Sequence, residues 1–511
     1  YINAYIATNI YKEPANKYFD DDNFYECVVD AYNKENKTSI PYTQNLSDSQ
    51  LGSIKKVECD GNGVSDNNKV KSAKGIEKLT ALTSLDVSWN KLTTLDVSNN
   101  TNLTELYIGL NRLTTLDVSK NTALTRLDVV RNELTTLDVS KNTALTALNV
   151  SFNQLTTLDV SNNTNLTELY IVLNRLTTLD VSKNAALTSL VVGSNQLTTL
   201  DVSKNTALTE LRVSENHLTI LDVGKNTKLT VLDVSGYHLT ALDVSGATSL
   251  TVLDVSGSKL TTLDVSKNTT LKRLSASNNH LTTLDVSKNT ALTELQVSGN
   301  HLTILDVSNN VNLNELRVED NNLTNLDISK NTNLLFLNVR NNKLNKLSIN
   351  SDIEALELDY DLVPNVELSN NSKLKNVRLW KKKYVYLEDN FVFDDIPKEY
   401  INKFNLDFSN LSWEYPESIS SQDNKNFKTS ELGNYAIHGI YNPGEYYSIG
   451  DGFKQKKERL TYDIYVVKIT SNKYNIDEDN KNIFNTEGVS DKDILNDINI
   501  EYGNINEKYK I

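Results

Sequence analysis

The sequence predicts a β-rich solenoid with added segments at both ends. A phrase of 21 residues recurs thirteen times between residues 82 and 354 without insertion or deletion, and its fourth copy reads LTALNVSFNQLTTLDVSNNTN. A fixed period of this length is typical of solenoids, because one unit cannot bury its own apolar face and must stack on its neighbours. Six positions of the unit are apolar in every copy, and the array contains no proline. Both observations favour stacked parallel strands.

The composition excludes several classes of function. The formal net charge of −14 over 511 residues argues against a nucleic-acid partner or an anionic membrane surface, since both require basic patches. No run of 18 apolar residues exists, so we expect no membrane span. The chain begins at Tyr1 and contains no methionine, which we interpret as a processed or excised fragment.

Residues 1–81 are predicted to form a helical N-terminal cap that leads into the first strand. The segment from Asp20 to Asn36 places apolar residues at helical spacing after acidic residues, and Ser47 to Gln50 has the S-x-x-Q form of a capping box. The following KKVECDG alternates like a strand. Cys27 and Cys59 are the two cysteines of the chain, and the sequence leaves open whether they form a disulfide or stay reduced.

Residues 82–354 carry the array itself. Numbered from its first leucine, the unit reads L-x-x-L-x-V-x-x-N-x-L, followed by T-T-L-D-V-S-K-N-x-x. This pattern resembles the leucine-rich repeat family, whose regular segment reads L-x-x-L-x-L-x-x-N-x-L, over a little more than half of the chain. The resemblance implies a parallel β-sheet on a concave face. We expect short extended strands on the opposite face, because 21 residues leave little room for a helix.

Asparagine at position 9 is predicted to hold the turn of each unit. It occurs in eleven copies, beginning with Asn90, and a buried side-chain amide can bond backbone groups of its own and the neighbouring turn. Tyr237 and Ser258 replace it in units eight and nine. We therefore expect the packing to loosen there.

The variation among copies points to a recognition surface. Positions 11–17 scarcely change, whereas positions 3, 5, 7, 8 and 10 change freely, and these positions face outward on the concave sheet and its edge. In the first six units this face carries aromatic, aliphatic and arginine side chains, which are typical interface anchors. The alternatives are drift in a young repeat, or cover by another segment. The candidate ligand-binding residues are Trp89, Tyr107, Leu110, Arg112, Arg126, Val130, Arg131, Phe152, Tyr170, Val172, Leu173, Arg175 and Val191.

A longer regularity overlies the repeat. Units two and five are almost identical, so the array contains a duplication of 63 residues. It would place Tyr107 and Leu110 in one patch and Tyr170 and Leu173 in a second patch about 15 Å away. Such twin patches suit an extended or repetitive ligand, although unequal crossing-over without selection explains them equally simply.

Three further residue types recur at fixed positions of the repeat, and each can be explained either by a chemical function or by a structural role. Aspartate at position 15 could collect a metal, but turn formation explains it more simply. Threonines at positions 12 and 13 resemble an ice-binding array, yet threonine also suits strands. Four of the five histidines occupy position 10 and could ligate zinc or titrate as a switch. Because a third ligand at usable spacing is missing, we interpret them as exposed edge residues and assign no metal or cofactor; these are His217, His238, His280 and His301.

The C-terminal part departs from the repeat. Residues 355–383 are predicted to be degenerate repeats that close the array, and residues 384–511 a β-rich appendage whose last part, from about residue 430, is a small and truncated module. The sequence around Asn442, Pro443 and Gly444 is typical of a hairpin, and LTYDIYVVKIT of a strand. A short helix is expected from Ser490 or Asp491.

The order of cap, array and β-rich segment resembles the internalin-like adhesins of Gram-positive bacteria. The resemblance rests on the helical cap with its GIEKLTALTSLDVSWN entry and on the regular repeat, although the period is 21 rather than 22. It implies a monomeric, secreted or surface-displayed bacterial protein whose concave sheet binds a host or extracellular protein, or a glycan. No nucleophile–base pair or phosphate loop indicates an enzyme. Two alternatives remain: a structural spacer that displays the C-terminal module, and a secreted effector whose activity lies in that module.

Overall fold

The computed structural model divides into two compact units, Tyr1–Leu335 with Asn341–Ser351, and Phe336–Arg340 with Asp352–Ile511. It describes residues 18–236, 238–349, 353–359, 362 and 365–368. Beyond these it describes only the backbones of strands between residues 376 and 484. Each unit is considered by itself below.

The first unit begins with the predicted helical cap. Helix α1 (Asp22–Asn36) starts at Asp21, whose carboxylate accepts hydrogen bonds from two backbone N–H groups, and it ends at Lys37 in the left-handed region. The short helix α2 (Asp48–Leu51) has the predicted capping box between Ser47 and Gln50. Two 3-10 turns follow further along the chain, Asp66–Asn68 and Ile76–Lys78. The apolar side of α1 is buried, which confirms the helical spacing inferred from the sequence.

A disulfide joins the cap to the sheet. Cys27 on α1 and Cys59, directly after strand β1 (Lys56–Glu58), are bonded, with their Cα atoms 5.5 Å apart. Strand β1 pairs in parallel with the first strand of the array, so that Val57 lies beside Leu85. The sequence left open whether Cys27 and Cys59 are bonded or reduced, and in the structure they form a disulfide.

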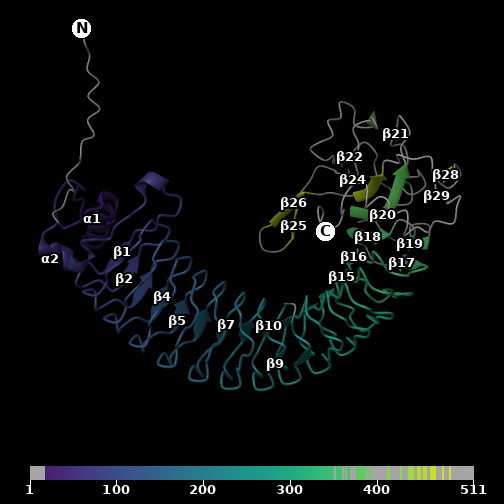
Figure 1. The fold of residues 1–511 in the computed structure, drawn as a ribbon, viewed down its shortest axis with the longest axis horizontal. Coiled ribbons are helices and arrows are strands. Elements are labelled where there is room, and N and C mark those ends of the chain that lie inside the picture. The colour runs from purple at the N-terminus through teal and green to yellow at the C-terminus, as the bar shows by residue number, and fades with distance from the viewer. Residues whose placement is uncertain are drawn as a thin grey trace, which may run out of the picture. The chain divides into compact units, whose positions relative to one another are not determined.

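Each of the first twelve repeats contributes one three-residue strand to a parallel sheet (Figure 1). Neighbouring strands pair with residues 21 apart as partners, for example Leu106 with Leu127. Figure 1 shows β10 toward the inner side of this curved array and β9 toward its outer side. The strands are β2 (Ser84–Asp86), β3 (Glu105–Tyr107), β4 (Arg126–Asp128), β5 (Ala147–Asn149), β6 (Glu168–Tyr170), β7 (Ser189–Val191), β8 (Glu210–Arg212), β10 (Val231–Asp233), β12 (Val252–Asp254), β13 (Arg273–Ser275), β14 (Glu294–Gln296) and β15 (Glu315–Arg317).

The opposite face is extended, as expected for so short a unit. In the described part of the first unit it contains no helix, and its regular strands are β9 (Ile220–Asp222), β11 (Ala241–Asp243) and β17 (Leu347–Ile349). Strands β9 and β11 pair in parallel. The leucines and valines at the conserved apolar positions fill the space between the two faces, and most are fully buried.

Two columns of buried asparagines hold the turns. At position 9, Asn132 accepts a hydrogen bond from the Leu113 N–H at 3.0 Å and donates to the carbonyls of Ile108 and Val129 at 3.0 and 3.1 Å. This confirms the predicted role. At position 19, Asn142 donates to the carbonyls of Val118 and Asn121, both at 2.9 Å. Each asparagine thus joins neighbouring units through backbone groups that would otherwise be buried without partners.

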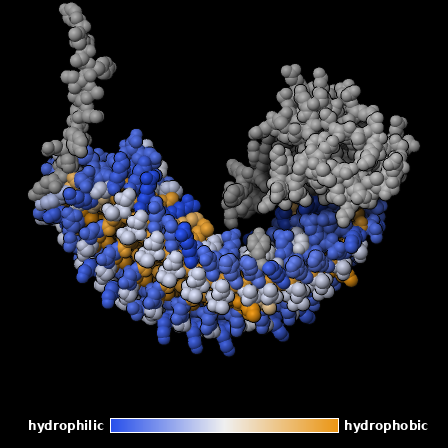
Figure 2. Space-filling view, viewed as in Figure 1, coloured by the Kyte–Doolittle hydropathy of each residue, from blue (hydrophilic) through white to orange (hydrophobic). Residues whose placement is uncertain are grey.

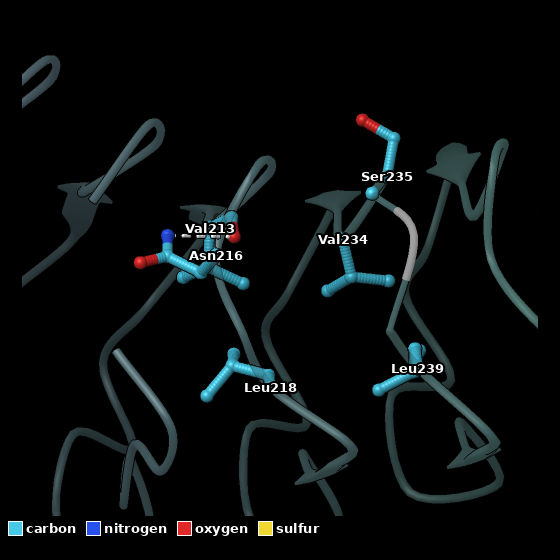
Figure 3. A pocket seen from close by; sticks show the side chains of 7 residues that line it. Val213, Asn216, Leu218, Val234, Ser235 and Leu239 are labelled. Carbon is cyan, nitrogen blue, oxygen red and sulfur yellow. Dashed lines mark hydrogen bonds between the residues drawn. The ribbon is translucent and has the colours of Figure 1, made fainter. Parts of the chain in front are cut away.

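Both columns are interrupted in unit eight, by Tyr237 at position 9 and by Ala247 at position 19. A pocket opens beside this break, lined by apolar side chains that include Val213 and Val234 (Figure 3). The His238 N–H donates to Gly236 at 2.9 Å, whereas the equivalent His217 N–H donates across to Leu197 of the preceding unit. In unit eight a bond between units is thus replaced by a bond within the unit, whereas Ser258 of unit nine donates across to the Gly236 carbonyl at 2.9 Å.

The second unit is mainly β. Strand β16 (Phe336–Asn338) pairs in parallel with β18 (Ala355–Asp359), and β18 pairs with β20 (Asn376–Tyr386). Strand β27 (Thr461–Val467) lies between β20 and β24 (Tyr435–Tyr441), and β22 (Leu411–Glu414) pairs with β24. The remaining strands are β19 (Val366–Leu368), β21 (Phe391–Val392), β23 (Asn426–Phe427), β25 (Tyr446–Ile449), β26 (Phe453–Lys456), β28 (Asn475–Ile476) and β29 (Ile483–Phe484).

One sequence expectation in this unit is wrong. The residues before and after Asn442, Pro443 and Gly444 form β24 and β25, but these strands do not pair with each other. Strand β24 pairs with β22 and β27, while β25 pairs with β26. Turn-forming residues therefore do not by themselves fix which strands become neighbours. The predicted strand in LTYDIYVVKIT is confirmed as β27, and the helix expected from Ser490 lies outside the described residues.

Candidate ligand-binding face

All thirteen candidate residues are at least partly exposed. Tyr107, Tyr170 and Val191 occupy position 5 at the ends of their strands, and Val130 and Val172 follow at position 7. Arg126 lies at position 3 of its repeat, where it is the first residue of β4. Arg112 and Arg175 follow the turn at position 10, where both side chains are exposed. Figure 2 shows one side of the array, where hydrophilic and intermediate residues predominate and hydrophobic residues form short patches.

The other five candidates form one continuous line, which we call the rim column. It occupies position 8, immediately before the buried asparagine, on five successive repeats. The backbone N–H of Leu110 donates to the Val130 carbonyl at 2.7 Å, and that of Phe152 to the Val172 carbonyl at 2.7 Å. Neighbouring members are therefore one strand spacing apart, about 4.8 Å. The rim column consists of Trp89, Leu110, Arg131, Phe152 and Leu173.

Every residue of the rim column has a left-handed backbone. The φ angles are +59° at Trp89, +55° at Leu110, +52° at Arg131, +58° at Phe152 and +54° at Leu173. For a residue other than glycine, asparagine or aspartate this conformation costs about 1–2 kcal/mol, because the Cβ atom approaches the following carbonyl oxygen. The turn that buries the next asparagine imposes this conformation on whichever residue occupies position 8.

The choice of residue at position 8 changes along the array. After the rim column, Ser194 and Glu215 keep positive φ angles of 54° and 53°. From unit eight onward the position is filled only by residues that tolerate a left-handed backbone, namely Gly236, Gly257, Asn278, Gly299, Asp320 and Asn341. The same turn is thus built with low-strain residues in the second half of the array and with bulky side chains in the first half.

Charged groups lie on both sides of Tyr107. Tyr107 lies between Asp86 and Asp128 in the sheet. Asp128 accepts hydrogen bonds from the Val130 N–H at 3.0 Å and from the Asn149 amide at 3.2 Å. Burial nevertheless raises the pKa of the Asp128 carboxyl, and burial together with the nearby Glu105 raises the pKa of the Tyr107 hydroxyl.

One direct contact joins two members of the rim column. The Arg131 guanidinium carbon lies 4.7 Å from the centre of the Phe152 ring, a cation–π arrangement. In contrast, Tyr107 and Tyr170 share position 5 but are separated by the strands that carry Asp128 and Asn149. The structure therefore forms a continuous line of large side chains at position 8, interrupted by no small residue, and two separate tyrosines at position 5.

The aspartate column on the opposite face forms turns, as inferred from the sequence. The Ser119 N–H donates to Asp117 Oδ1 at 2.8 Å, and the same bond recurs between Ser140 and Asp138. These bonds hold the pKa of both carboxyls below the ordinary range. Within the described residues, no three or more His, Cys, Asp or Glu side chains are grouped closely enough to hold a metal ion. None of the described helices is both long and apolar enough to cross a membrane.

Two features of the site escaped the sequence reasoning. The left-handed backbone at position 8 is one, since Trp89 and Phe152 are not residues that indicate such a conformation. The second asparagine column is the other. Its signal was present, because asparagine fills position 19 as regularly as position 9, from Asn100 to Asn331.

The chain is similar to known leucine-rich repeat proteins. The family model described as "Leucine Rich repeat" matches residues 78–99, 141–161 and 277–293, and that of the "LVIVD repeat" matches residues 296–317. The functional domain of InlJ from Listeria monocytogenes is 31% identical with a TM-score of 0.57, and the match covers 88% of this chain and 97% of that domain. That domain includes a cysteine ladder, whereas the present array has asparagine ladders and no cysteine.

Two further matches are to proteins of the same organism. An internalin, InlF of Listeria monocytogenes, is 25% identical with a TM-score of 0.57, over 63% of this chain and 96% of that structure. Internalin J of Listeria monocytogenes serotype 4b is 39% identical over 86 residues. That last match spans 17% of this chain and only 8% of the length of internalin J.

Proposed function

The chain belongs to the internalin-like leucine-rich repeat proteins, and from this premise we propose that it is a bacterial surface or secreted adhesin that binds a host protein through the rim column and the adjoining concave sheet. Internalin-like leucine-rich repeat proteins are generally binding proteins rather than enzymes.

The observation that carries the proposal is the backbone strain of the rim column. Five successive repeats place Trp, Leu, Arg, Phe and Leu where repeats eight to thirteen place Gly, Asn or Asp. At about 1–2 kcal/mol per residue, the bulky choice destabilises the array without helping it to fold. Strain that persists along one surface indicates a function of the side chains concerned. Aromatic and arginine residues on an exposed rim are the types that anchor protein interfaces.

The test is binding to host cells, with variants designed to keep the fold. Asparagine is the residue that later repeats use at this position, so Trp89→Asn, Leu110→Asn and Leu173→Asn together should leave the array folded. We expect the labelled full chain to bind cultured epithelial cells and this triple variant to lose at least tenfold in affinity, since each interface anchor contributes about 1–2 kcal/mol or more.

The matched control is Asn278→Gly with Asp320→Gly, at the same position of later repeats. It should bind like the native chain. Equal binding by the native chain and the triple variant would exclude the rim column as the site. Deletion of residues 390–511 tests the alternative that the protein is an effector whose activity lies in the C-terminal unit. An adhesin that binds through the array should still bind cells after this deletion, whereas such an effector would lose its activity.

A further inference from the structure

We propose that the edge of the array carries two binding sites for divalent transition-metal ions, each formed by a pair of histidines on neighbouring repeats. The first pair is His217 and His238, and the second is His280 and His301. All four occupy position 10 of the repeat, and the two pairs are 63 residues apart. This proposal does not depend on the rim column, which lies in earlier repeats.

The ring geometry suits a shared ion. The imidazole centres of His217 and His238 are 5.0 Å apart with an interplanar angle of 83°, and those of His280 and His301 are 5.9 Å apart with an angle of 6°. Two imidazoles that bind one ion at Zn–N distances of about 2.0–2.1 Å place their ring centres roughly 5 Å apart. The first pair already has this separation, and the second reaches it by rotation of exposed side chains.

The backbone holds three of the four histidines in place before any ion binds, whereas the His238 N–H donates to Gly236 of its own repeat at 2.9 Å. The His217 N–H donates to the Leu197 carbonyl at 2.8 Å, and those of His280 and His301 donate to Leu260 and Leu281 at 2.9 and 2.8 Å. Each of these bonds fixes a histidine to the repeat before it. Less conformational freedom is therefore lost when two imidazoles converge on one ion than would be lost from a flexible segment.

The neighbours set the character of each site. Gln196 precedes the first pair at position 10, Lys259 separates the two pairs, and Asn322 follows the second. The positive charge of Lys259 disfavours an ion between the pairs. With two protein ligands each, both sites keep coordination positions open for water or for a donor from another molecule. Imidazole ligands select Zn²⁺, Ni²⁺ or Cu²⁺ over Mg²⁺ or Ca²⁺, with Cu²⁺ bound most tightly.

The experiment is calorimetric titration of the full chain with Ni²⁺ and Zn²⁺. We expect two ions per chain for the native protein, one for His217→Asn, one for His280→Asn, and none for the double variant. His438→Asn, which replaces the fifth histidine, is the control and should keep two. Mg²⁺ should produce no heat of binding at these sites.

Two outcomes would overturn the proposal. One is a native chain that binds neither ion, and the other is a double variant that still binds two. Because all four side chains are exposed, the substitutions are not expected to unfold the array, and a circular dichroism spectrum of each variant verifies this. Cell binding by the rim column is measured in chelated buffer, so that the two proposals fail or succeed separately.

Discussion

Positions 8 and 9 of the repeat are adjacent in the chain, yet in the third repeat the side chain at position 9 is buried and the one at position 8 is exposed. Asn132 is buried and bonded to three backbone groups, while Arg131 directly before it is exposed and lies over the Phe152 ring. The asparagine requires the turn, and the turn forces its predecessor into a left-handed conformation. The fold therefore determines position 9 and leaves position 8 to be chosen for other reasons, at a cost in stability.

The same comparison can be made along position 8. Leu110 and Asn278 have the same φ angle of +55°, in repeats built on the same scaffold. Asparagine adopts this conformation at little cost, whereas leucine adopts it at a cost of about 1–2 kcal/mol. The first half of the array thus gives up stability that the second half keeps. This difference is the basis of the binding role that we propose for the rim column.

The largest effect is expected when the buried position is changed. Asn132→Ala removes three hydrogen bonds and leaves buried backbone groups unpaired, so the free energy of unfolding should fall by about 3 kcal/mol. Arg131→Ala, one residue earlier, should change it by about 0.5 kcal/mol or less. Urea denaturation followed by circular dichroism measures both variants. Equal losses would mean that the two positions do not differ as described.

A smaller effect of opposite sign is expected at the rim column. Leu110→Asn and Leu173→Asn each replace a strained residue by one that tolerates the left-handed region, and each should raise the free energy of unfolding by about 1 kcal/mol. The reverse change in the second half, Asn278→Leu, should lower it by a similar amount. If Leu110→Asn instead destabilises the protein, the leucine contributes to folding, and the argument from strain no longer supports a binding role.

The smallest effect concerns the opposite face and appears only in acid. Serine N–H groups lower the pKa of Asp117 and Asp138 in the folded state. A lowered pKa stabilises the protein above the ordinary aspartate value of about 3.9, and this contribution disappears as the pH falls through the folded value. Asp117→Asn with Asp138→Asn keeps the hydrogen-bond acceptors but cannot titrate. Urea midpoints at about pH 7 and pH 3 should therefore differ less in this variant than in the native chain.

Much of the fold could be predicted because each repeat contacts mainly its neighbours. The period of 21 residues, the buried leucines and the role of Asn132 all follow from local pattern and stacking. The capping box at Ser47 and Gln50 is equally local. Pairings between strands that are distant in the sequence could not be predicted in this way. The residues around Asn442 indicated a turn, but they did not indicate that β24 pairs with β22 and β27.

The candidate face shows the same division. Its residues were identified from variation among copies, and the exposure of Tyr107 and Leu173 agrees with that reasoning. The strain at Trp89 and Phe152 could not be inferred, since neither residue type indicates a left-handed backbone. This strain arises from backbone hydrogen bonds between neighbouring repeats, which exist only when the repeats are stacked.

The sequence by itself determined the solenoid, its core and the surface on which variation is concentrated. This is possible because, in repeats of constant length, each residue stacks on the equivalent residue of the next repeat. The tertiary structure decided what depends on separate segments meeting in space. It joined Cys27 to Cys59 and brought His217 to His238. It also gave Trp89 and its equivalents a conformation that only a stacked turn imposes. Local pattern records which groups must be buried, whereas strain and ring geometry depend on the stack as a whole.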